Sequence, residues 1–276
     1  VKKDYLVNTS KYPLNCKYYR VSMQGQLQDK GYYPEGRLYV TKTTDENGNE
    51  SYEFKNIAGN VILKRTICSI DEAADTYYIY DYRGNLAFVL PPNYQEEPSL
   101  DLYAYQYKYD GQGNCTWKKL PGCEPIYMKY DLSGRMTYLQ DGNLRKKGLW
   151  EFCVYDKLGR LAVQGTTASI SDASKIHVYA LYTGAGILDG YQLNGTTITA
   201  KSLLITNFYD DYTFIEKQNA SEQSILHLNA AQALDAAFPS NSSPNAKGFL
   251  TGKKVYTSDG TNRHEISSMY YGLKGR

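Results

Sequence analysis

The sequence has no uninterrupted apolar run close to the roughly 20 residues that a membrane-spanning helix needs. Charge of one sign does not predominate either, because 31 Lys and Arg stand against 29 Asp and Glu. Nucleic-acid binders depend on clustered basic residues, and the two short clusters here, Lys118–Lys119 and Arg145–Lys147, are typical of solvated turns. We therefore expect no membrane span in this segment and no nucleic-acid partner.

Residues that carry chemistry are few and scattered. The cysteines are odd in number and lack CxxC spacing, which predicts buried free thiols: Cys16, Cys68, Cys115, Cys123 and Cys153. The histidines have no partner at metal or triad spacing and are expected to be surface or structural residues: His177, His227 and His264. Asp45–Asn49 offers alternating oxygens, but Asn56 stands where an EF-hand has its bidentate Glu. We expect neither a metal nor another cofactor.

Phenylalanine is scarce at 7 residues, whereas tyrosine reaches 29 of 276. Tyr joins a large apolar ring to a polar hydroxyl and favours half-buried pleated surfaces over dry cores. The composition therefore indicates an all-β protein with sheet faces that are neither fully dry nor fully solvated.

One pattern, Tyr-Asp-x-x-Gly-Asn/Arg, organises the chain. Its four full copies contribute these Tyr, Asp and Gly residues: Tyr80, Asp81 and Gly84; Tyr109, Asp110 and Gly113; Tyr130, Asp131 and Gly134; Tyr155, Asp156 and Gly159. Looser copies are Asp45–Asn49, Asn56–Asn60 and the final Tyr271–Arg276. Repetition at 20–30 residues is typical of architectures in which small units stack on their neighbours.

The motif has a mechanical interpretation. An Asp at the start of a tight turn accepts a hydrogen bond from the backbone N–H two residues on. A Gly three residues after it takes the left-handed conformation that ends such a turn with a bulge. The alternating run Tyr103–Tyr109 has the period of a strand with one aromatic face. Each copy is therefore expected to be the tip of an antiparallel hairpin, and the fold to be a strip of consecutive hairpins.

The regularity changes along the chain. Residues 1–165 are predicted to form the hairpin array, 166–260 an irregular insertion with strands and a short helix, and 261–276 the start of a further truncated repeat. The helix is expected over Ser221–Phe238, with Ser221 as a possible N-cap. Within the insertion, Tyr209–Tyr212 starts like the motif but lacks its Gly.

The four motif copies and their spacing resemble the Rhs/YD-repeat family, mainly over residues 30–165. The resemblance implies a β-strip that winds into a hollow shell, as in large bacterial surface or secreted proteins, among them wall-associated proteins and polymorphic toxins. Toxin members enclose a C-terminal toxic domain and cleave themselves at an Asp-Pro-Gly-type segment. No Asp-Pro-x-Gly segment occurs here, so self-cleavage and toxicity are not carried over.

The leading hypothesis is a non-enzymatic segment of such a shell, extracellular or at the cell surface, whose partners are the rest of its own chain or an enclosed C-terminal domain. The alternative is a cell-surface carbohydrate-binding module in which sugar rings stack on Trp117, Trp150, Tyr105 and Tyr107. A glycosidase is the least favoured, because the adjacent Asp210 and Asp211 would point to opposite faces of a strand. No residue is assigned a catalytic role.

Overall fold

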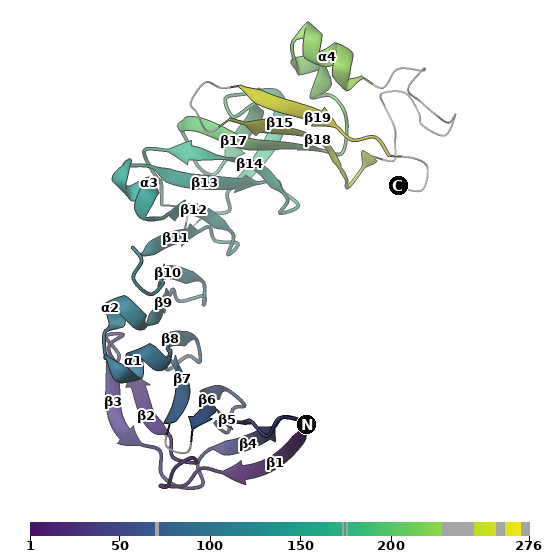
Figure 1. The fold of residues 1–276 in the computed structure, drawn as a ribbon. Helices are drawn as coiled ribbons and strands as arrows, with labels where there is room; N and C mark the ends of the chain where they lie inside the picture. Colours follow the sequence, from purple (N-terminus) through teal and green to yellow (C-terminus); the bar gives the residue numbers. More distant parts are fainter. Residues whose placement is uncertain (70–71, 173, 175, 228–245, 258–262, 272–276) are drawn as a thin grey trace. The chain divides into compact units, whose positions relative to one another are not determined.

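The computed structural model describes all residues except 70–71, 173, 175, 228–245, 258–262 and 272–276. The chain divides into two compact units, Val1–Tyr127 and Met128–Arg276, each described by itself (Figure 1). Antiparallel strands dominate both, which confirms the all-β prediction. This unit boundary after Tyr127 does not coincide with the predicted boundaries at 165 and 260. Those boundaries mark where the repeat motif changes along the sequence, and they remain a prediction.

In the first unit, β4 to β10 lie beside one another in chain order, and β1 lies on the outer side of β4, which gives the order β1-β4-β5-β6-β7-β8-β9-β10. The strands are β1 (Lys2–Val7), β2 (Lys17–Val21), β3 (Leu27–Tyr32), β4 (Tyr39–Thr44), β5 (Glu50–Lys55), β6 (Val61–Ser69), β7 (Glu72–Tyr80), β8 (Leu86–Leu90), β9 (Tyr105–Tyr109) and β10 (Cys115–Lys119). Helices α1 (Pro92–Glu96) and α2 (Leu100–Tyr103) connect β8 to β9. Strand β11 (Ile126–Tyr130) spans the unit boundary, and its first two residues pair with β10.

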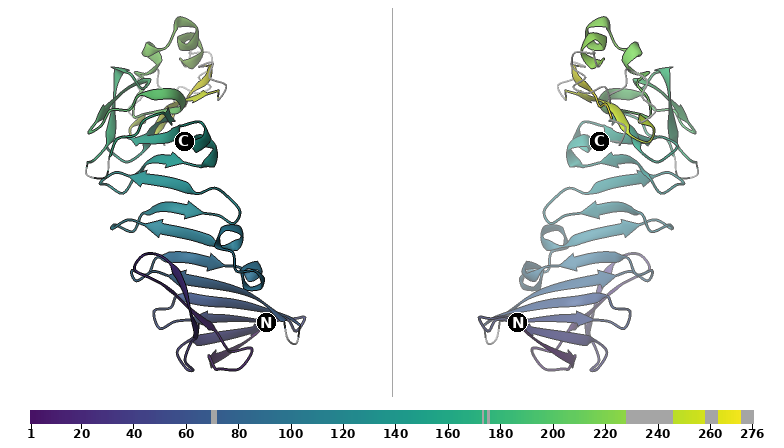
Figure 2. Two further views of the ribbon diagram at one scale, coloured as in Figure 1. Left: turned by 90° about the vertical axis from the view of Figure 1, so that its left-hand side faces the viewer. Right: turned by 90° about the vertical axis from the view of Figure 1, so that its right-hand side faces the viewer.

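One face of this sheet is apolar because paired residues of adjacent antiparallel strands point the same way. Phe54, Leu63, Tyr77 and Leu90 form a cross-strand row, and each is at most 2% exposed. Burying such a side chain stabilises the fold by about 1.5–3 kcal/mol. The hairpin β2–β3 lies across this face and pairs only within itself among the described strands (Figures 1 and 2).

A buried ion pair holds the segment before β2 against the sheet. Arg65 on β6 is 5% exposed and bonds Asp75 on β7 through two nitrogens, at 2.7 and 2.6 Å. Its Nη1 donates to the carbonyls of Pro13 (2.8 Å) and Asn15 (3.0 Å). Loss of either partner of the ion pair would leave an uncompensated buried charge, which is costly. The bonds from the buried Arg65 to these two carbonyls therefore hold the segment in place.

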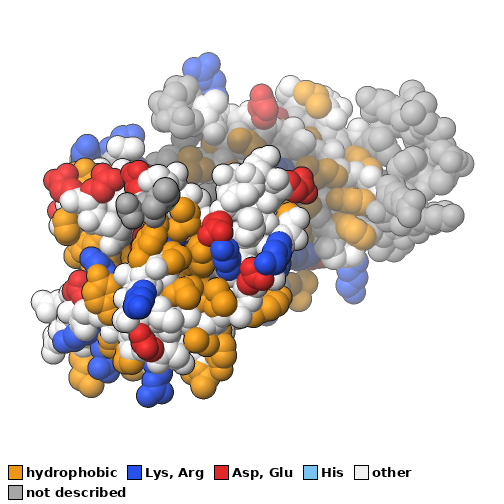
Figure 3. Space-filling model, turned by 60° about the horizontal axis from the view of Figure 1, so that its bottom comes forward, with side chains coloured by type: hydrophobic (Ala, Val, Ile, Leu, Met, Phe, Trp, Pro, Cys, Tyr) orange, Lys and Arg blue, Asp and Glu red, His pale blue; other side chains and the backbone are white. Residues whose placement is uncertain are grey.

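The sheet of the first unit also has a free edge at β1. Hydrophobic side chains gather at this end of the unit, among Lys, Arg, Asp and Glu (Figure 3). Tyr5, Val7 and Tyr39 of β1 and β4 are 80%, 47% and 62% exposed. The described residues provide no strand that pairs with the outer side of β1.

In the second unit the sheet order is β12-β13-β14-β17-β18-β19, and β15–β16 forms a separate hairpin. The elements are β12 (Met136–Gln140), α3 (Gly142–Lys146), β13 (Trp150–Tyr155), β14 (Leu161–Thr167), β15 (Tyr179–Gly186), β16 (Gly190–Asn194), β17 (Ala200–Tyr209), η1 (Ile215–Lys217), α4 (Ala220–Leu226), β18 (Leu250–Tyr256) and β19 (His264–Ser268). Its core includes Phe208 and Phe214, stacked 4.3 Å apart. Gly252 is required there, because a Cβ would lie 2.1 Å from the Phe214 ring.

Two local predictions need correction. Helix α4 begins at Ala220, and its N-cap is Asn219 instead of Ser221. Asn219 and Glu222 exchange the two bonds of a capping box, which fixes the helix start two residues earlier. The described helix ends at Leu226, and 228–238 of the predicted helix lie outside the described residues.

All five cysteines are free thiols, but only Cys16 and Cys153 are buried, whereas Cys68 and Cys123 are exposed and Cys115 is half-buried.

Candidate functional site

The copy at Tyr80–Asn85 shows how the motif forms a hairpin tip. Oδ1 of Asp81 accepts hydrogen bonds from the backbone N–H groups of Arg83 (2.9 Å) and Asn85 (2.8 Å). Gly84 donates its N–H to the Asp81 carbonyl (3.1 Å) and has a φ of 85°, in the left-handed region that favours glycine. Asp81 donates its own N–H to the Asn85 carbonyl at 2.8 Å, which closes the tip where the strand register shifts.

The same bonds recur in five other turns. Backbone N–H groups two and four residues on donate to Asp45, Asn56, Asp110, Asp131 and Asp156. The glycines three residues after them have φ values of 72–86°: Gly48, Gly59, Gly113, Gly134 and Gly159. An amide oxygen thus serves as well as a carboxylate, since the turn needs only an acceptor. These turns have the geometry expected from the motif.

The turn bonds also act on carboxyl acidity. The Asn49 side-chain amide, above all, holds the pKa of Asp45 below its usual value. Burial raises the pKa of Asp110, but the hydrogen bonds from Asn114 and the turn N–H groups together outweigh it and lower the pKa. These two carboxylates are therefore anionic structural acceptors at neutral pH, unsuited to general acid catalysis.

Within each unit, tyrosine hydroxyls connect hairpins to the ones before them. Five of them donate to the carbonyl located two residues after the glycine of the preceding turn: Tyr80 to Val61 (3.1 Å), Tyr109 to Leu86 (2.9 Å), Tyr155 to Met136 (3.2 Å), Tyr209 to Leu161 (2.9 Å) and Tyr271 to Leu250 (2.6 Å). We call this bond the tyrosine tie. Phenylalanine cannot form it, which gives a physical reason for tyrosine at these positions.

The arginine in the last motif position makes a second connection. Arg135 bonds its own turn at Asp131 Oδ2 (2.7 Å) and also the Val178 carbonyl (2.6 Å). Arg160 bonds Asp156 Oδ2 at 2.6 Å, and its two terminal nitrogens bond the carboxylate of Asp210 at 3.0 and 2.6 Å. The bond to Asp210 is the main reason that the pKa of Arg160 is raised. Bidentate pairing of this kind adds directional specificity to the stacking of hairpins.

Asp210 belongs to a repeat that the sequence reasoning did not recognise. Asp210 donates its N–H to the carbonyl of Phe249 (3.1 Å), and Gly248, with a φ of 91°, donates its N–H to Asp210 Oδ1 (2.7 Å). Tyr209 opposes Leu250 with the same register shift as in the other tips. The Gly follows the Asp after 38 positions instead of three. Residues 211–247 are therefore an insertion within one hairpin tip, which we call the tip insertion.

Within the first unit, the aromatic residues of the carbohydrate hypothesis do not all lie on one face of the sheet. Trp117 opposes Lys108, whereas Tyr107 opposes Lys118, so Trp117 and Tyr107 point to opposite faces of the sheet. The Lys108 ammonium lies 4.7 Å from the centre of the Trp117 ring. Tyr105 is 37% exposed, and Trp150 packs on the core of the second unit. Sugar stacking by these rings remains a prediction.

Other polar candidates have structural partners. Asp211 Oδ1 accepts the N–H of Thr213 at 2.9 Å. His177 Nδ1 lies 2.7 Å from Ser133 Oγ, and His264 Nε2 lies 2.7 Å from a Glu222 oxygen. The described part of the chain contains no group of three or more His, Cys, Asp or Glu that could hold a metal ion. None of its helices is long and apolar enough to cross a membrane.

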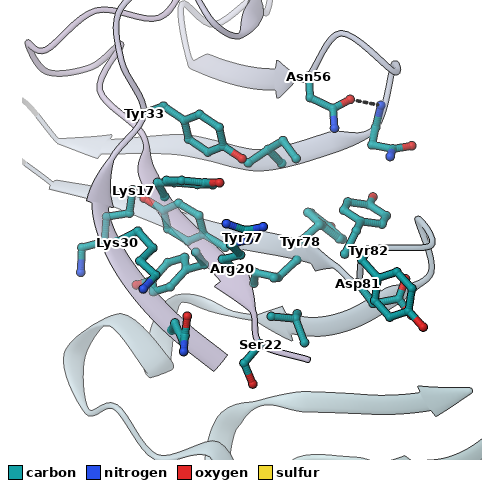
Figure 4. Close-up of a pocket in the computed structure, with 18 of the residues that line it drawn as sticks. Lys17, Arg20, Ser22, Lys30, Tyr33, Asn56, Tyr77, Tyr78, Asp81 and Tyr82 are labelled. Carbon is teal, nitrogen blue, oxygen red and sulfur yellow. Dashed lines mark hydrogen bonds between the residues drawn. The ribbon is translucent and has the colours of Figure 1, made fainter. Parts of the chain in front are cut away.

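A groove of about 900 Å³ lies in the first unit between hairpin β2–β3 and the sheet (Figure 4). It is lined by every residue from Lys17 to Met23, by Gln28, Lys30 and Tyr33, by Asn56, Asn60 and Ile62, and by Tyr77–Tyr82 with Gly84. Tyr18 and Tyr33 stand with ring centres 4.6 Å apart. The sequence reasoning missed this groove, because Lys17–Arg20 carries no motif and lies opposite β7 only through long-range packing.

These observations define a class: an all-β protein of consecutive antiparallel hairpins with a recurrent Asp–Gly tip and tyrosine ties between hairpins. No known protein-family model and no curated protein matches the sequence. Among solved structures, the chain is similar to one titled "Crystal Structure of TcdB2-TccC3", with 15% sequence identity and a TM-score of 0.39. The match covers 95% of this chain and 16% of that chain, so this chain spans a small part of its length.

Proposed function

We propose that this chain is a non-enzymatic structural segment of a YD-repeat shell in a large bacterial surface or secreted protein of the Rhs type. Its task is to form wall that scaffolds or encloses other parts of the same polypeptide. The observation that carries the proposal is the repetition of one bonding scheme, in which the Asp and Gly shape each tip and the tyrosine tie joins successive hairpins.

These bonds are better suited to holding the hairpins together than to binding a ligand. Both carboxylate oxygens of Asp81 are occupied by its own turn, since Oδ2 accepts Nδ2 of Asn85 at 3.1 Å. In the second unit the equivalent oxygens are occupied by Arg135 and Arg160. The repeated polar groups are thus used within the wall. The described contacts of Trp117, Trp150, Tyr105 and Tyr107 do not favour the alternative, a carbohydrate-binding module.

The test uses the full polypeptide that contains this chain. Electron microscopy is expected to show a hollow shell with this segment in its wall, and the enclosed region is expected to resist trypsin. A variant with Gly84→Val and Gly159→Val weakens two tips, so it should speed cleavage of the enclosed region. Leu158→Ser is the matched control, because Leu158 lies in the same tip and is 73% exposed. Equal cleavage in wild type and the glycine variant, with no hollow shell in the images, would refute the proposal.

A further inference from the structure

The groove of the first unit runs along an open strand edge. All of β2 lines it without alternation, Lys17 to Val21, whereas β3 contributes only the alternate residues Gln28 and Lys30. Strand β2 pairs with β3 on one side, and no described strand pairs with its other side. The backbone of Lys17, at the start of β2, bonds Tyr77 of β7. Beyond such contacts, a strand edge presents unpaired backbone N–H and C=O groups, which pair readily with an extended chain.

The cations of the groove have no acidic partners. Lys17, Arg20 and Lys30 make no ion pair within the described residues. The lining thus has three cationic side chains against one carboxylate, that of Asp81, which is bonded within its own turn. Asp29 is not among the residues that line the groove, and its Oδ1 accepts the Gly31 N–H at 2.8 Å. The groove is thus electropositive.

Many cations elsewhere in the same unit are paired. Lys42 lies 2.5 Å from Glu50, Lys55 lies 2.7 Å from Glu53, and Arg65 is bonded to Asp75. Figure 4 shows Lys17 and Lys30 at one end of the groove, Arg20 between, and Tyr78 and Tyr82 towards the other end. The three unpaired charges therefore lie along the groove instead of at one point.

The aromatic lining offers surface for apolar side chains between those charges. Tyr18 and Tyr78 are half-buried, and their hydroxyls have no hydrogen-bond partner among the described residues. Tyr82 is 80% exposed. A smaller hollow of about 330 Å³ shares Val21–Met23 and Asp81–Tyr82 with the groove and extends it towards Gly111. A linear ligand fits this shape better than a compact one.

From these features we propose that the groove binds an extended acidic peptide segment of a partner protein, which adds a strand to the open edge of β2. The backbone of the peptide would pair with β2, and its side chains would alternate between the cations and the tyrosine rings. A polysaccharide could meet the cations but cannot complete a β-ladder, so the open edge favours a peptide. The inference is independent of the shell function.

The probe is the peptide acetyl-(Glu-Val)4-amide, with binding measured by calorimetry on the whole chain. We expect saturable binding that weakens as salt is raised, because exposed charges are screened. Acetyl-(Lys-Val)4-amide should not bind. Two N-methylated versions of the acidic peptide are then compared, one methylated at the Glu residues and the other at the Val residues. At least one of them should lose binding, because N-methylation removes backbone N–H groups that donate to a β-ladder. Strand addition would be overturned if both N-methylated forms bound as tightly as the unmodified peptide.

Charge reversal locates the site. The double variant Arg20→Glu and Lys30→Glu should weaken binding about tenfold, since exposed ion pairs contribute modestly. Lys11→Glu with Arg37→Glu is the matched control, because both residues are exposed, lie outside the groove and change the net charge equally. Unfolding curves must show that both variants fold. The proposal is wrong if the two variants bind alike, if no peptide binds at millimolar concentration, or if polygalacturonate binds and the acidic peptide does not.

Discussion

The hairpin tips allow a quantitative test at Gly159. Its φ is 82°, and a Cβ placed there would meet no heavy atom within 4 Å. Replacement by Val therefore introduces no clash, and its effect is the conformational cost of an L-residue in the left-handed region. That cost is about 1–2 kcal/mol, with a β-branched residue at the upper end.

The cost converts to a melting shift that calorimetry resolves. For a unit the size of Met128–Arg276, 1 kcal/mol corresponds to a Tm change of about 2–4 °C. Gly159→Val should therefore lower Tm by about 2–8 °C. Gly159→Asn should lower it by less than half as much, because Asn tolerates positive φ.

The control for this test lies in the same turn. Leu158 is exposed and contributes its backbone N–H to Asp156 at 2.8 Å, which a change of side chain leaves in place. Leu158→Ser should alter stability by no more than about 0.5 kcal/mol. The reasoning is refuted if Gly159→Val has the same Tm as the wild type, or if the Asn and Val variants lower Tm equally.

Three further predictions concern other parts of the chain. Gly134→Val should also lower Tm by several degrees, because Gly134 has a φ of 72°; an unchanged Tm would contradict the assignment of that turn. The bond from Arg160 holds the pKa of Asp210 below its unfolded value near 4, so this stabilisation is complete above about pH 4 and is lost as pH falls through the lower folded pKa. Urea unfolding should then show a smaller acid-induced loss in Asp210→Asn than in wild type, and equal losses would argue against the ion pair. The exposed Cys68 should react with a thiol reagent in the native state much faster than Cys16, whose pKa burial raises to about 12; mass spectrometry of the labelled peptides checks this, and equal rates would contradict the burial assignments.

Features within one hairpin were the most predictable from sequence. The Asp and Gly of a tip are three residues apart, and their bonds depend on local backbone geometry alone. The same logic accounts for Asn56, which has the required acceptor in a different side chain. The tyrosine tie was not predicted, because alternation places a ring on a face but does not specify the acceptor of its hydroxyl.

Features that join distant segments were not predictable in this way. Arg65 bonds the carbonyl of Pro13, 52 positions away, and no pattern in either segment indicates the other. The groove depends on the resulting position of β2 against β7. Its lining contains ordinary Lys, Arg and Tyr residues, and only their shared surroundings mark them as a site.

The interrupted repeat shows a limit of fixed spacing. Tyr209 and Asp210 match the motif, but a search for Gly three positions later fails because Gly248 is 38 positions away. The positive φ of Gly248 and the register of Leu250 identify the repeat only once β17 and β18 are seen to pair. The sequence signal was present in two separated halves.

The tip insertion shows that chain length at a hairpin tip and the pairing of its strands vary independently. By chain statistics, closing a loop of 38 positions instead of three costs only about 2 kcal/mol. The bidentate bond between Arg160 and Asp210 and the stacking of Phe208 on Phe214 oppose that cost. A tip can thus contain a long inserted segment whose two ends meet closely, while the strands on either side keep their pairing. Because Phe214 and Ile215 of the tip insertion are buried in the core of the second unit, this long tip also supplies part of the packing beneath it, and any residues that replaced it would have to fill the same space.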